Sequence, residues 1–167
     1  MTGHEDGKGP RVRLVTVDDV AELVRLRRLM FDSMGIDTTD TRWEDVARST
    51  IAKEILEGRM IAAVVSNPET DRELIASGIV QFEARLPSPE NAAAKKAHLS
   101  SMSTDPHWRK RGYANDVLEL LISECRNRGV GVVSLYATAD GRPLYERAGF
   151  RERGPGSLPE LQLILPT

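Results

Sequence analysis

Residues 98–137 constrain the fold more than any other stretch, because their hydrophobic pattern changes twice around a basic turn. His98 to Thr104 is uncharged apart from its histidine and predicts a strand. Apolar residues then recur at three- and four-residue spacing from Gly112 to Arg128, which predicts an amphipathic helix. Val130 to Ala137 predicts another strand. Strand, helix and strand in this order form a βαβ unit, whose strands are parallel and whose crossover is right-handed.

The turn of this unit, Arg109-Lys110-Arg111-Gly112-Tyr113-Ala114, has the composition of an anion-binding site. Backbone N–H groups at a helix start have no partner within the helix, and the helix dipole adds partial positive charge there. Gly112 allows the backbone to approach an anion closely, and Ala114 keeps the next turn narrow. The sequence therefore predicts a phosphate-binding turn.

The remaining pattern predicts a mixed sheet with helices on both faces, in the order β-α-α-β-β-β-α-β-α-β-β. Thr16 and Asp19 have the spacing of a capping box before the first helix, which Gly35 ends. Gly78 lies inside a predicted strand, where a bulge is plausible. The further predicted strands are 12–17, 60–65, 74–84, 150–153 and 161–165, and the further helices are 20–34, 43–56 and 141–148.

Charge and length exclude several classes of protein. The net charge of −2 and the pI of about 6.0 argue against general nucleic-acid binding. The 167 residues contain no run of about 18 apolar residues, so we expect no membrane span. One cysteine, Cys125, excludes an internal disulfide and favours a cytoplasmic location; on an apolar helix face it is expected to be buried. We expect residues 1–11 to be a flexible tail without a secretory signal, and 12–167 to be one domain.

Two segments allow alternative interpretations. Arg25, Arg27 and Arg28 occupy the polar side of the first helix, where a solvated face is the first expectation and a docking patch the second. Residues 86–96 form the longest predicted loop in the middle of the chain, either beside a substrate or as a solvated connector.

A second motif, Leu135-Tyr136-Ala137-Thr138-Ala139-Asp140-Gly141-Arg142-Pro143-Leu144-Tyr145-Glu146-Arg147-Ala148-Gly149-Phe150, follows the basic turn. With Arg-x-x-Gly-x-Ala at 109–114, it resembles the GCN5-related N-acetyltransferase (GNAT) family, whose coenzyme A pyrophosphate loop reads Gln/Arg-x-x-Gly-x-Gly/Ala. The resemblance extends from Val12 to Leu165. It implies an α/β (α+β) fold, with a mainly antiparallel sheet, a central splayed pair of parallel strands and helices on both faces.

The resemblance also implies a site for acetyl-CoA. The backbones of Met102, Ser103 and Thr104 would hold the pantetheine arm, and the amides of residues 109–114 the pyrophosphate. The implied cofactor-binding residues are Met102, Ser103, Thr104, Arg109, Lys110, Arg111, Gly112, Tyr113, Ala114, Thr138 and Arg142.

Tyr145 matches the tyrosine that the family uses near the departing sulfur; the alternative is a tyrosine that only packs the last helix. Glu83 is the candidate base that deprotonates the amine, and a solvated strand residue is its alternative. His98 and His107 are further candidates. The scattered histidines and single cysteine give no metal-ligand spacing, so no metal is expected.

We therefore expect an N-acetyltransferase that transfers the acetyl group of acetyl-CoA to a primary amine of a small molecule, by direct attack in a ternary complex. A protein or peptide amine is the alternative acceptor. A non-catalytic sensor module that binds acyl-CoA is the alternative from another class. Members of the family often dimerise through their last two strands, so a homodimer is a possible assembly of this chain.

Overall fold

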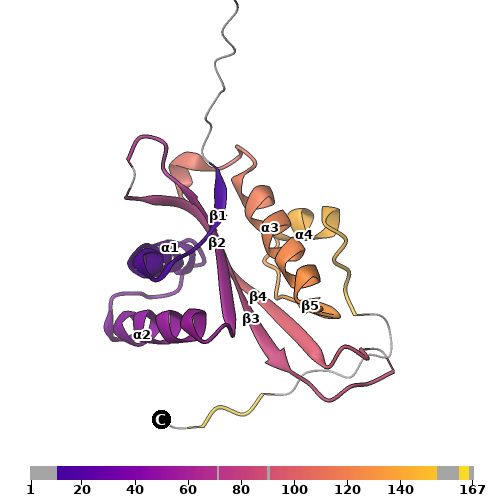
Figure 1. Cartoon of the computed structure of the whole chain (residues 1–167). Helices are drawn as coiled ribbons and strands as arrows, with labels where there is room; N and C mark the ends of the chain where they lie inside the picture. The colour runs from indigo at the N-terminus through magenta and orange to yellow at the C-terminus, as the bar shows by residue number, and fades with distance from the viewer. Residues whose placement is uncertain (1–10, 71, 90, 154–161, 166–167) are drawn as a thin grey trace, which may run out of the picture. The chain divides into compact units, whose positions relative to one another are not determined.

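The computed structural model describes residues 11–70, 72–89, 91–153 and 162–165. The chain divides into two compact units, Met1–Tyr136 and Ala137–Thr167. The first unit contains a five-stranded sheet in the order β1-β2-β3-β4-β5 (Figure 1). Its neighbours pair antiparallel except for the parallel pair β4 and β5, which confirms the predicted mixed sheet. The strands are β1 (Val12–Leu14), β2 (Met60–Ser66), β3 (Leu74–Ala84), β4 (Lys95–Thr104) and β5 (Val132–Ser134).

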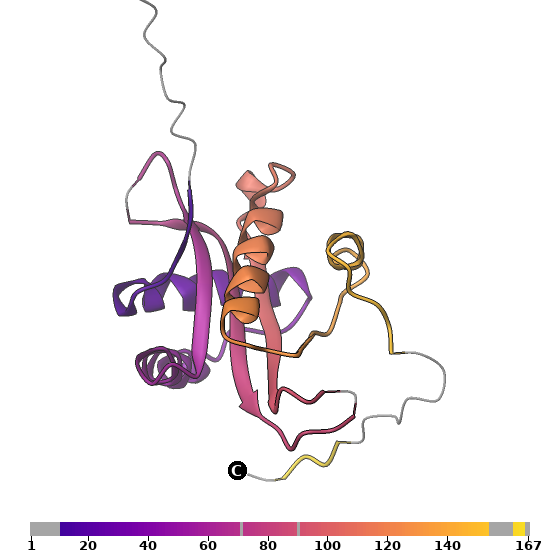
Figure 2. The ribbon, with the colours of Figure 1, turned by 45° about the vertical axis from the view of Figure 1, so that its right-hand side comes forward.

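Helices cover both faces of this sheet, as the sequence predicted. Helices α1 (Val20–Ser33) and α2 (Arg42–Leu56) lie on one face, and α3 (Tyr113–Asn127) lies on the other (Figures 1 and 2). The α1 side is closed by a cluster of buried residues that includes Leu23, Leu26, Ile51 and Ile79. Burial of such side chains supplies most of the driving force for folding.

The local signals that set the first helices are present in the structure. The Asp19 carboxylate accepts a hydrogen bond from the Thr16 N–H at 2.8 Å and is also bound by Arg13, which lowers the pKa of Asp19. Gly35 follows α1 with φ +73°, a conformation that favours glycine. Cys125 is buried on α3, and burial raises the pKa of its thiol.

A bulge interrupts the pairing of β3 with β4 at Gly78. Ser77 pairs with Ser103 and Ile79 with Ser100, so Ser101 and Met102 lie opposite Gly78 alone. Ser101 has φ +53°, which is unusual for a residue other than glycine. A Cβ atom on Gly78 would lie 2.4 Å from the Met102 Sδ and 2.9 Å from the Val117 Cγ1. The bulge that the sequence suggested is confirmed, and it needs glycine because β3 passes closely beneath Met102 and α3.

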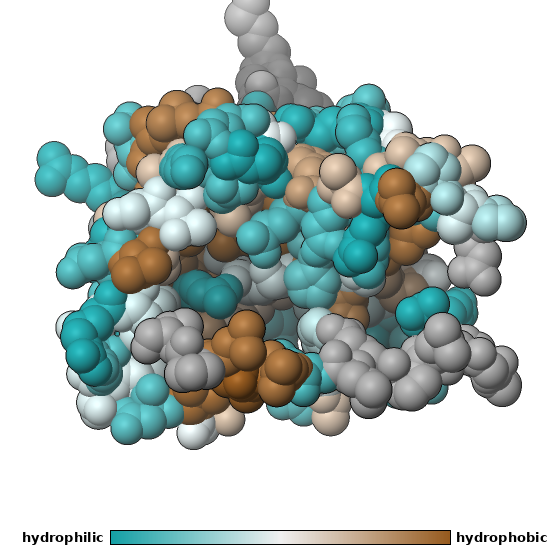
Figure 3. All heavy atoms as spheres, turned by 90° about the horizontal axis from the view of Figure 1, so that it is seen from below, coloured by the Kyte–Doolittle hydropathy of each residue, from teal (hydrophilic) through white to brown (hydrophobic). Residues whose placement is uncertain are grey.

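Hydrophilic and hydrophobic side chains alternate over the face that Figure 3 colours by hydropathy. Among the described residues on that face, hydrophilic side chains surround several separate hydrophobic groups. This face therefore gives no argument for the homodimer, which stays a prediction.

The second unit contains one short helix among its described residues, α4 (Arg142–Arg147), and Pro143 lies in its first turn as expected. The strands predicted at 150–153 and 161–165 are wrong in the described part: residues 150–153 and 162–165 have no strand pairing. Alternation of apolar and polar residues does not by itself supply a partner strand. The Gly154–Ser157 turn, Leu161 and the tail 1–10 lie outside the described residues. The strand predicted at Val130 to Ala137 is also too long, since among the described residues β5 pairs over Val132–Ser134.

Substituting Gly78 by alanine should lower the free energy of unfolding by about 1–3 kcal/mol, because the added methyl group overpacks a filled interior. Chemical denaturation would measure the loss. Combining Gly78→Ala with Met102→Ala should restore part of the lost stability, since the Met102 sulfur is the atom nearest to the added methyl group. A Gly78→Ala protein as stable as the wild type would contradict this account of the bulge.

Candidate active site

The C-terminal half of β4 has one side without a partner strand among the described residues. The strand pairs with β5 only through Lys96, Ala97 and His98, whereas it continues to Thr104. The bulge at Ser101 and Met102 falls within this unpaired half. The backbone polar groups of Met102–Thr104 on that side can therefore bind an extended ligand as a further strand would.

The turn after β4 exposes a run of backbone donors. The strand is followed by the short 3-10 helix η2 (Pro106–Trp108), and α3 begins at Tyr113. The backbone N–H groups of residues 109–114 have no hydrogen-bond acceptor among the residues that the structure describes. Those of Asn115 and Asp116 are the first to be satisfied, by the Gly112 carbonyl at 2.9 and 3.1 Å.

The backbone of this turn alternates in handedness. Arg109 has φ −66°, Lys110 has φ +61° and Gly112 has φ +89°, while Arg111 is not among the residues with positive φ. Positive φ at alternate residues is a feature of the anion-binding turns called nests, in which successive N–H groups converge, and the turn at 109–114 shares this feature. Lys110 adopts the left-handed conformation at a cost of about 1–2 kcal/mol, as strained residues at binding sites do.

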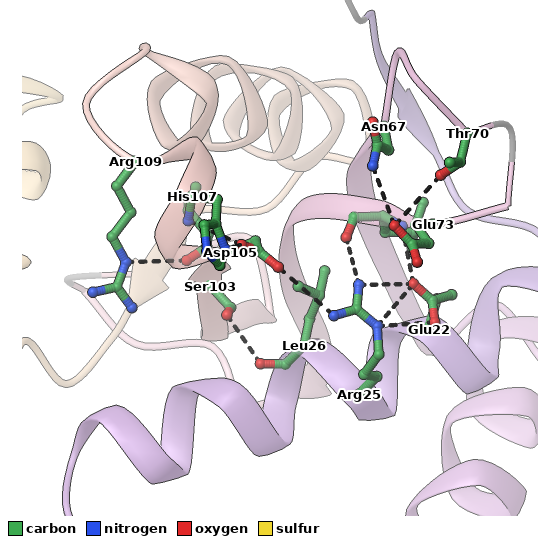
Figure 4. Close-up of polar contacts among 12 residues, drawn as sticks. Glu22, Arg25, Leu26, Asn67, Thr70, Glu73, Ser103, Asp105, His107 and Arg109 are labelled. Carbon is green, nitrogen blue, oxygen red and sulfur yellow. Dashed lines mark hydrogen bonds and ion pairs between the residues drawn. The ribbon is translucent and has the colours of Figure 1, made fainter.

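The basic side chains of the turn bind its own carbonyl groups. Arg109 Nε donates to the Thr104 carbonyl at 3.1 Å (Figure 4). Arg111 lies over the Trp108 ring at 4.7 Å and donates to the His107 carbonyl at 3.5 Å. Both guanidinium groups therefore hold the turn in shape, with donors left over for a ligand.

A polar network fixes the end of β4 against α1 (Figure 4). The Glu22 carboxylate binds Arg25 at 2.8 Å and accepts the Leu74 N–H at 3.0 Å. Arg25 donates to the Leu74 carbonyl at 2.8 Å and lies 3.9 Å from the Asp105 carboxylate. Asp105 in turn accepts the His107 N–H at 3.0 Å and starts η2. The turn is thus attached to the rigid sheet.

The predicted residues of the second motif lie in the second unit. The Thr138 hydroxyl accepts the Gly141 N–H at 3.2 Å, so it caps the approach to α4. Arg142 is bound by Glu146 and by Glu152, each at 2.6 Å. These contacts give both side chains a role in forming the unit, and their part in cofactor binding stays a prediction.

Tyr145 is half-buried on α4, and its ring meets that of Phe150 edge-on at 5.9 Å. Its hydroxyl has no hydrogen-bond partner among the described residues. Burial raises the pKa of Tyr145, so the hydroxyl stays protonated at neutral pH and can donate a hydrogen bond.

The candidate bases are distributed along β3 and β4. Glu83 pairs in register with Lys96 at the start of β4, the end opposite the turn, and binds Arg85 at 2.7 Å. His98 lies where β4 leaves β5, 3.3 Å from the Ser134 hydroxyl and against the Tyr136 ring. His107 is bound to Asp105 in η2. Glu83 as the base stays a prediction.

The loop predicted at 86–96 is shorter, because β4 begins at Lys95. Asn91 Nδ2 donates to the Lys95 carbonyl at 3.1 Å, and a Cβ on Gly131 would meet Asn91 Oδ1 at 2.2 Å. The loop therefore lies by the C-terminal end of α3, whereas the phosphate turn lies at its N-terminus. This position favours the connector over the substrate-side interpretation.

The expectation of a solvated arginine face on α1 is wrong. Arg25 and Arg28 are half-buried in ion pairs, Arg25 with Glu22 and Arg28 with Glu44. Arg27 is also half-buried and donates to the Ser101 hydroxyl. Sequence reasoning missed Arg27 and Ser101, because only the folded sheet brings residues so far apart in sequence together.

The described residues lack the features of two other classes of protein. No cluster of histidine, cysteine and carboxylate side chains there could hold a metal ion. No helix there is long and apolar enough to cross a membrane.

Comparisons with known proteins agree with the fold. The curated proteins contain no match. A predicted acetyltransferase from Clostridium acetobutylicum, solved with acetyl-CoA, shares 21% identity over 92% of this chain and 96% of its own, with a TM-score of 0.80. A GCN5-related N-acetyltransferase from Ralstonia eutropha shares 25% over 91% and 99%, with a TM-score of 0.77. Glucosamine-6-phosphate N-acetyltransferase from Arabidopsis thaliana shares 16% over 93% and 100%, with a TM-score of 0.69. The model of the acetyltransferase (GNAT) domain matches residues 11–153, and the chain therefore belongs to the GNAT acetyltransferase family.

Proposed function

We propose that this protein is an acetyl-CoA-dependent N-acetyltransferase that acts on a primary amine of a small molecule. The observation that carries the proposal is the turn at 109–114, where consecutive backbone N–H groups lack an acceptor among the described residues. A diphosphate supplies the acceptor oxygens and negative charge that such donors bind. The family and its relative from Ralstonia eutropha support the acetyl-transfer chemistry.

Each part of the site has a distinct task in this proposal. The amides of residues 109–114 hold the pyrophosphate, and the unpaired side of Met102–Thr104 holds the pantetheine arm as an added strand. Bound acetyl-CoA supplies an acyl group activated as a thioester. Fixing it beside the amine removes much of the entropic cost of a bimolecular reaction.

Tyr145 is proposed to donate a hydrogen bond to the departing thiolate. A tyrosine with a pKa near 10 gives a proton to a thiolate with a pKa near 8.5 only uphill, by about 2 kcal/mol. Burial raises the pKa of Tyr145, which makes full transfer less favourable still. A hydrogen bond to the sulfur stabilises the developing charge without that cost.

The amine must lose its proton before it attacks. An alkylammonium with a pKa near 10.4 is about 0.1% neutral at pH 7.4, which adds about 4 kcal/mol to the barrier. A carboxylate or imidazole acting through water would lower this cost. Glu83 is the proposed base, and His98, at the point where β4 leaves β5, is its alternative.

Gly112→Ala should weaken the binding of acetyl-CoA by about tenfold or more, because a side chain strains the left-handed turn that directs the N–H groups. Isothermal titration calorimetry would measure the dissociation constant. Gly35→Ala is the matched control: both glycines have positive φ and open space where a Cβ would lie. The two variants should lose similar stability, and only Gly112→Ala should lose affinity. Equal affinities would contradict a role of this turn.

Thiol release from acetyl-CoA, screened over amines, amino acids and peptides, tests catalysis. We expect release with a small-molecule amine, and Tyr145→Phe should lower kcat by about 100-fold while acetyl-CoA still binds. Release only with peptides would favour the alternative acceptor. Binding of acetyl-CoA without release by any amine would favour the sensor module.

The pH dependence of kcat should report the protonated Tyr145. Because burial raises its pKa above the ordinary value of about 10, the hydroxyl remains a donor up to that pH, and its ionisation lowers kcat only beyond it. Profiles of the wild type and Tyr145→Phe from pH 7 to 10.5 would test this. A fall below pH 10 that disappears in the phenylalanine variant would show that the hydroxyl ionises early.

A further inference from the structure

Arg27 is a half-buried cation without an anionic partner in the part of the chain that the structure describes. Its Nη1 donates to the Ser101 hydroxyl, and its guanidinium carbon lies 4.7 Å from the centre of the Phe31 ring. No carboxylate of the described residues lies within ion-pair distance of it, although Arg25 and Arg28 beside it on α1 are both paired. Burial, with no opposing contribution from an acid, lowers the pKa of Arg27, yet an arginine keeps its charge at physiological pH.

The position of this cation connects it to the proposed reaction. Ser101 is buried at the bulge of β4, directly before the Met102–Thr104 backbone. The α1 face of β4 also carries His98, Ser100 and Ser103, none of which is acidic. Ser103 donates to the Leu26 carbonyl at 2.9 Å, so α1 and β4 are held together beside Arg27. The cation therefore lies beside the bulge, next to the backbone that is proposed to hold the pantetheine arm.

A cation taken partly out of water without a partner is unfavourable, and a bound anion would remove that penalty. Ser101 occupies Nη1, and the contact with the Phe31 ring helps to hold the guanidinium group in place. The edge formed by Nε and Nη2 remains for a ligand, and this edge binds a carboxylate or phosphate through two parallel hydrogen bonds. Lysine, a single point charge, could not form this pair of bonds.

We propose that Arg27 binds an anionic group, a carboxylate or a phosphate, on the acceptor amine, so that the preferred acceptors are amino acids or aminoalkyl phosphates. The inference rests on the proposed acetyltransferase function and names the acceptor class for that site. It excludes diamines and polyamines as preferred acceptors, because their second ammonium group would meet Arg27 with like charge. The bulge thus selects the acceptor as well as ending the strand pairing.

Matched acceptors test the proposal. The wild type should have a higher kcat/KM for amino acids than for their amides, and for 2-aminoethyl phosphate than for ethanolamine, with putrescine poorest. Arg27→Met should reduce kcat/KM for the acidic acceptors by about 10- to 100-fold, mainly through KM, and leave the neutral ones unchanged. Arg27→Lys should recover part of the loss. The amino acid and phosphate arms show which anion is bound.

Arg59→Met is the control for loss of one positive charge, since Arg59 is bound to Glu54 and Glu57. It should keep the preference for acidic acceptors. Two results would overturn the inference: an equal loss with all acceptors in Arg27→Met, which would make Arg27 a support for the bulge, or a wild type that prefers neutral amines or diamines.

A binding measurement separates this inference from the proposed function. If no amine releases thiol, the acetyltransferase proposal fails, and thermal-shift titration with coenzyme A present decides on Arg27. Amino acids or 2-aminoethyl phosphate should then stabilise the wild type and not Arg27→Met. If neither anion stabilises the wild type, the inference is overturned as well.

Discussion

The close passage of β3 beneath β4 at Gly78 is the constraint on which the site depends. Because a side chain cannot fit there, Met102 lies against β3 and α3, and the extra residue of β4 is accommodated at Ser101 in a left-handed conformation. The bulge falls within the part of β4 that has already parted from β5. Within the described residues, a strand with unpaired backbone groups on one side thus leads directly into a turn whose N–H groups have no acceptor. Both features come from backbone geometry, and the side chains mainly hold that geometry in place.

Because the proposed binding uses backbone N–H groups, the arginine side chains of the turn need not face the ligand. Arg109 and Arg111 donate to carbonyl groups of the turn, and Arg25 joins the start of β3 to Asp105. Charge held close to the backbone raises the positive potential of the nest without occupying it. The overall charge of −2 is compatible with such a site, because binding depends on local donors and not on net charge.

Local sequence signals predicted those parts of the fold that depend on neighbouring residues. The helix stop at Gly35, the bulge at Gly78 and the turn at Gly112 each follow from one glycine, and the strand Leu74–Ala84 follows from a largely apolar run. The strands predicted at 150–153 and 161–165 failed because a strand needs a partner, which no local pattern supplies. In the candidate site, the tight turn before α3 was predictable from Gly112, and its binding of phosphate stays a prediction. The contact of Arg27 with Ser101 joins residues 74 positions apart and was not predictable.

For the same reason, the acceptor is harder to predict from the sequence than the cofactor. In the proposed site, acetyl-CoA is bound through backbone groups, and such groups leave a recognisable spacing of glycine and small residues in the sequence. An acceptor is bound by side chains that different elements bring together, and each such side chain alone has an ordinary explanation. On α1, three arginines follow the same helical pattern in the sequence. Two meet carboxylates, whereas Arg27, among the described residues, meets only a serine hydroxyl and an aromatic ring. The three residues are of the same type, and they differ in the partner that the folded chain gives to each. Acceptor class must therefore be inferred from unmatched charge in the folded site.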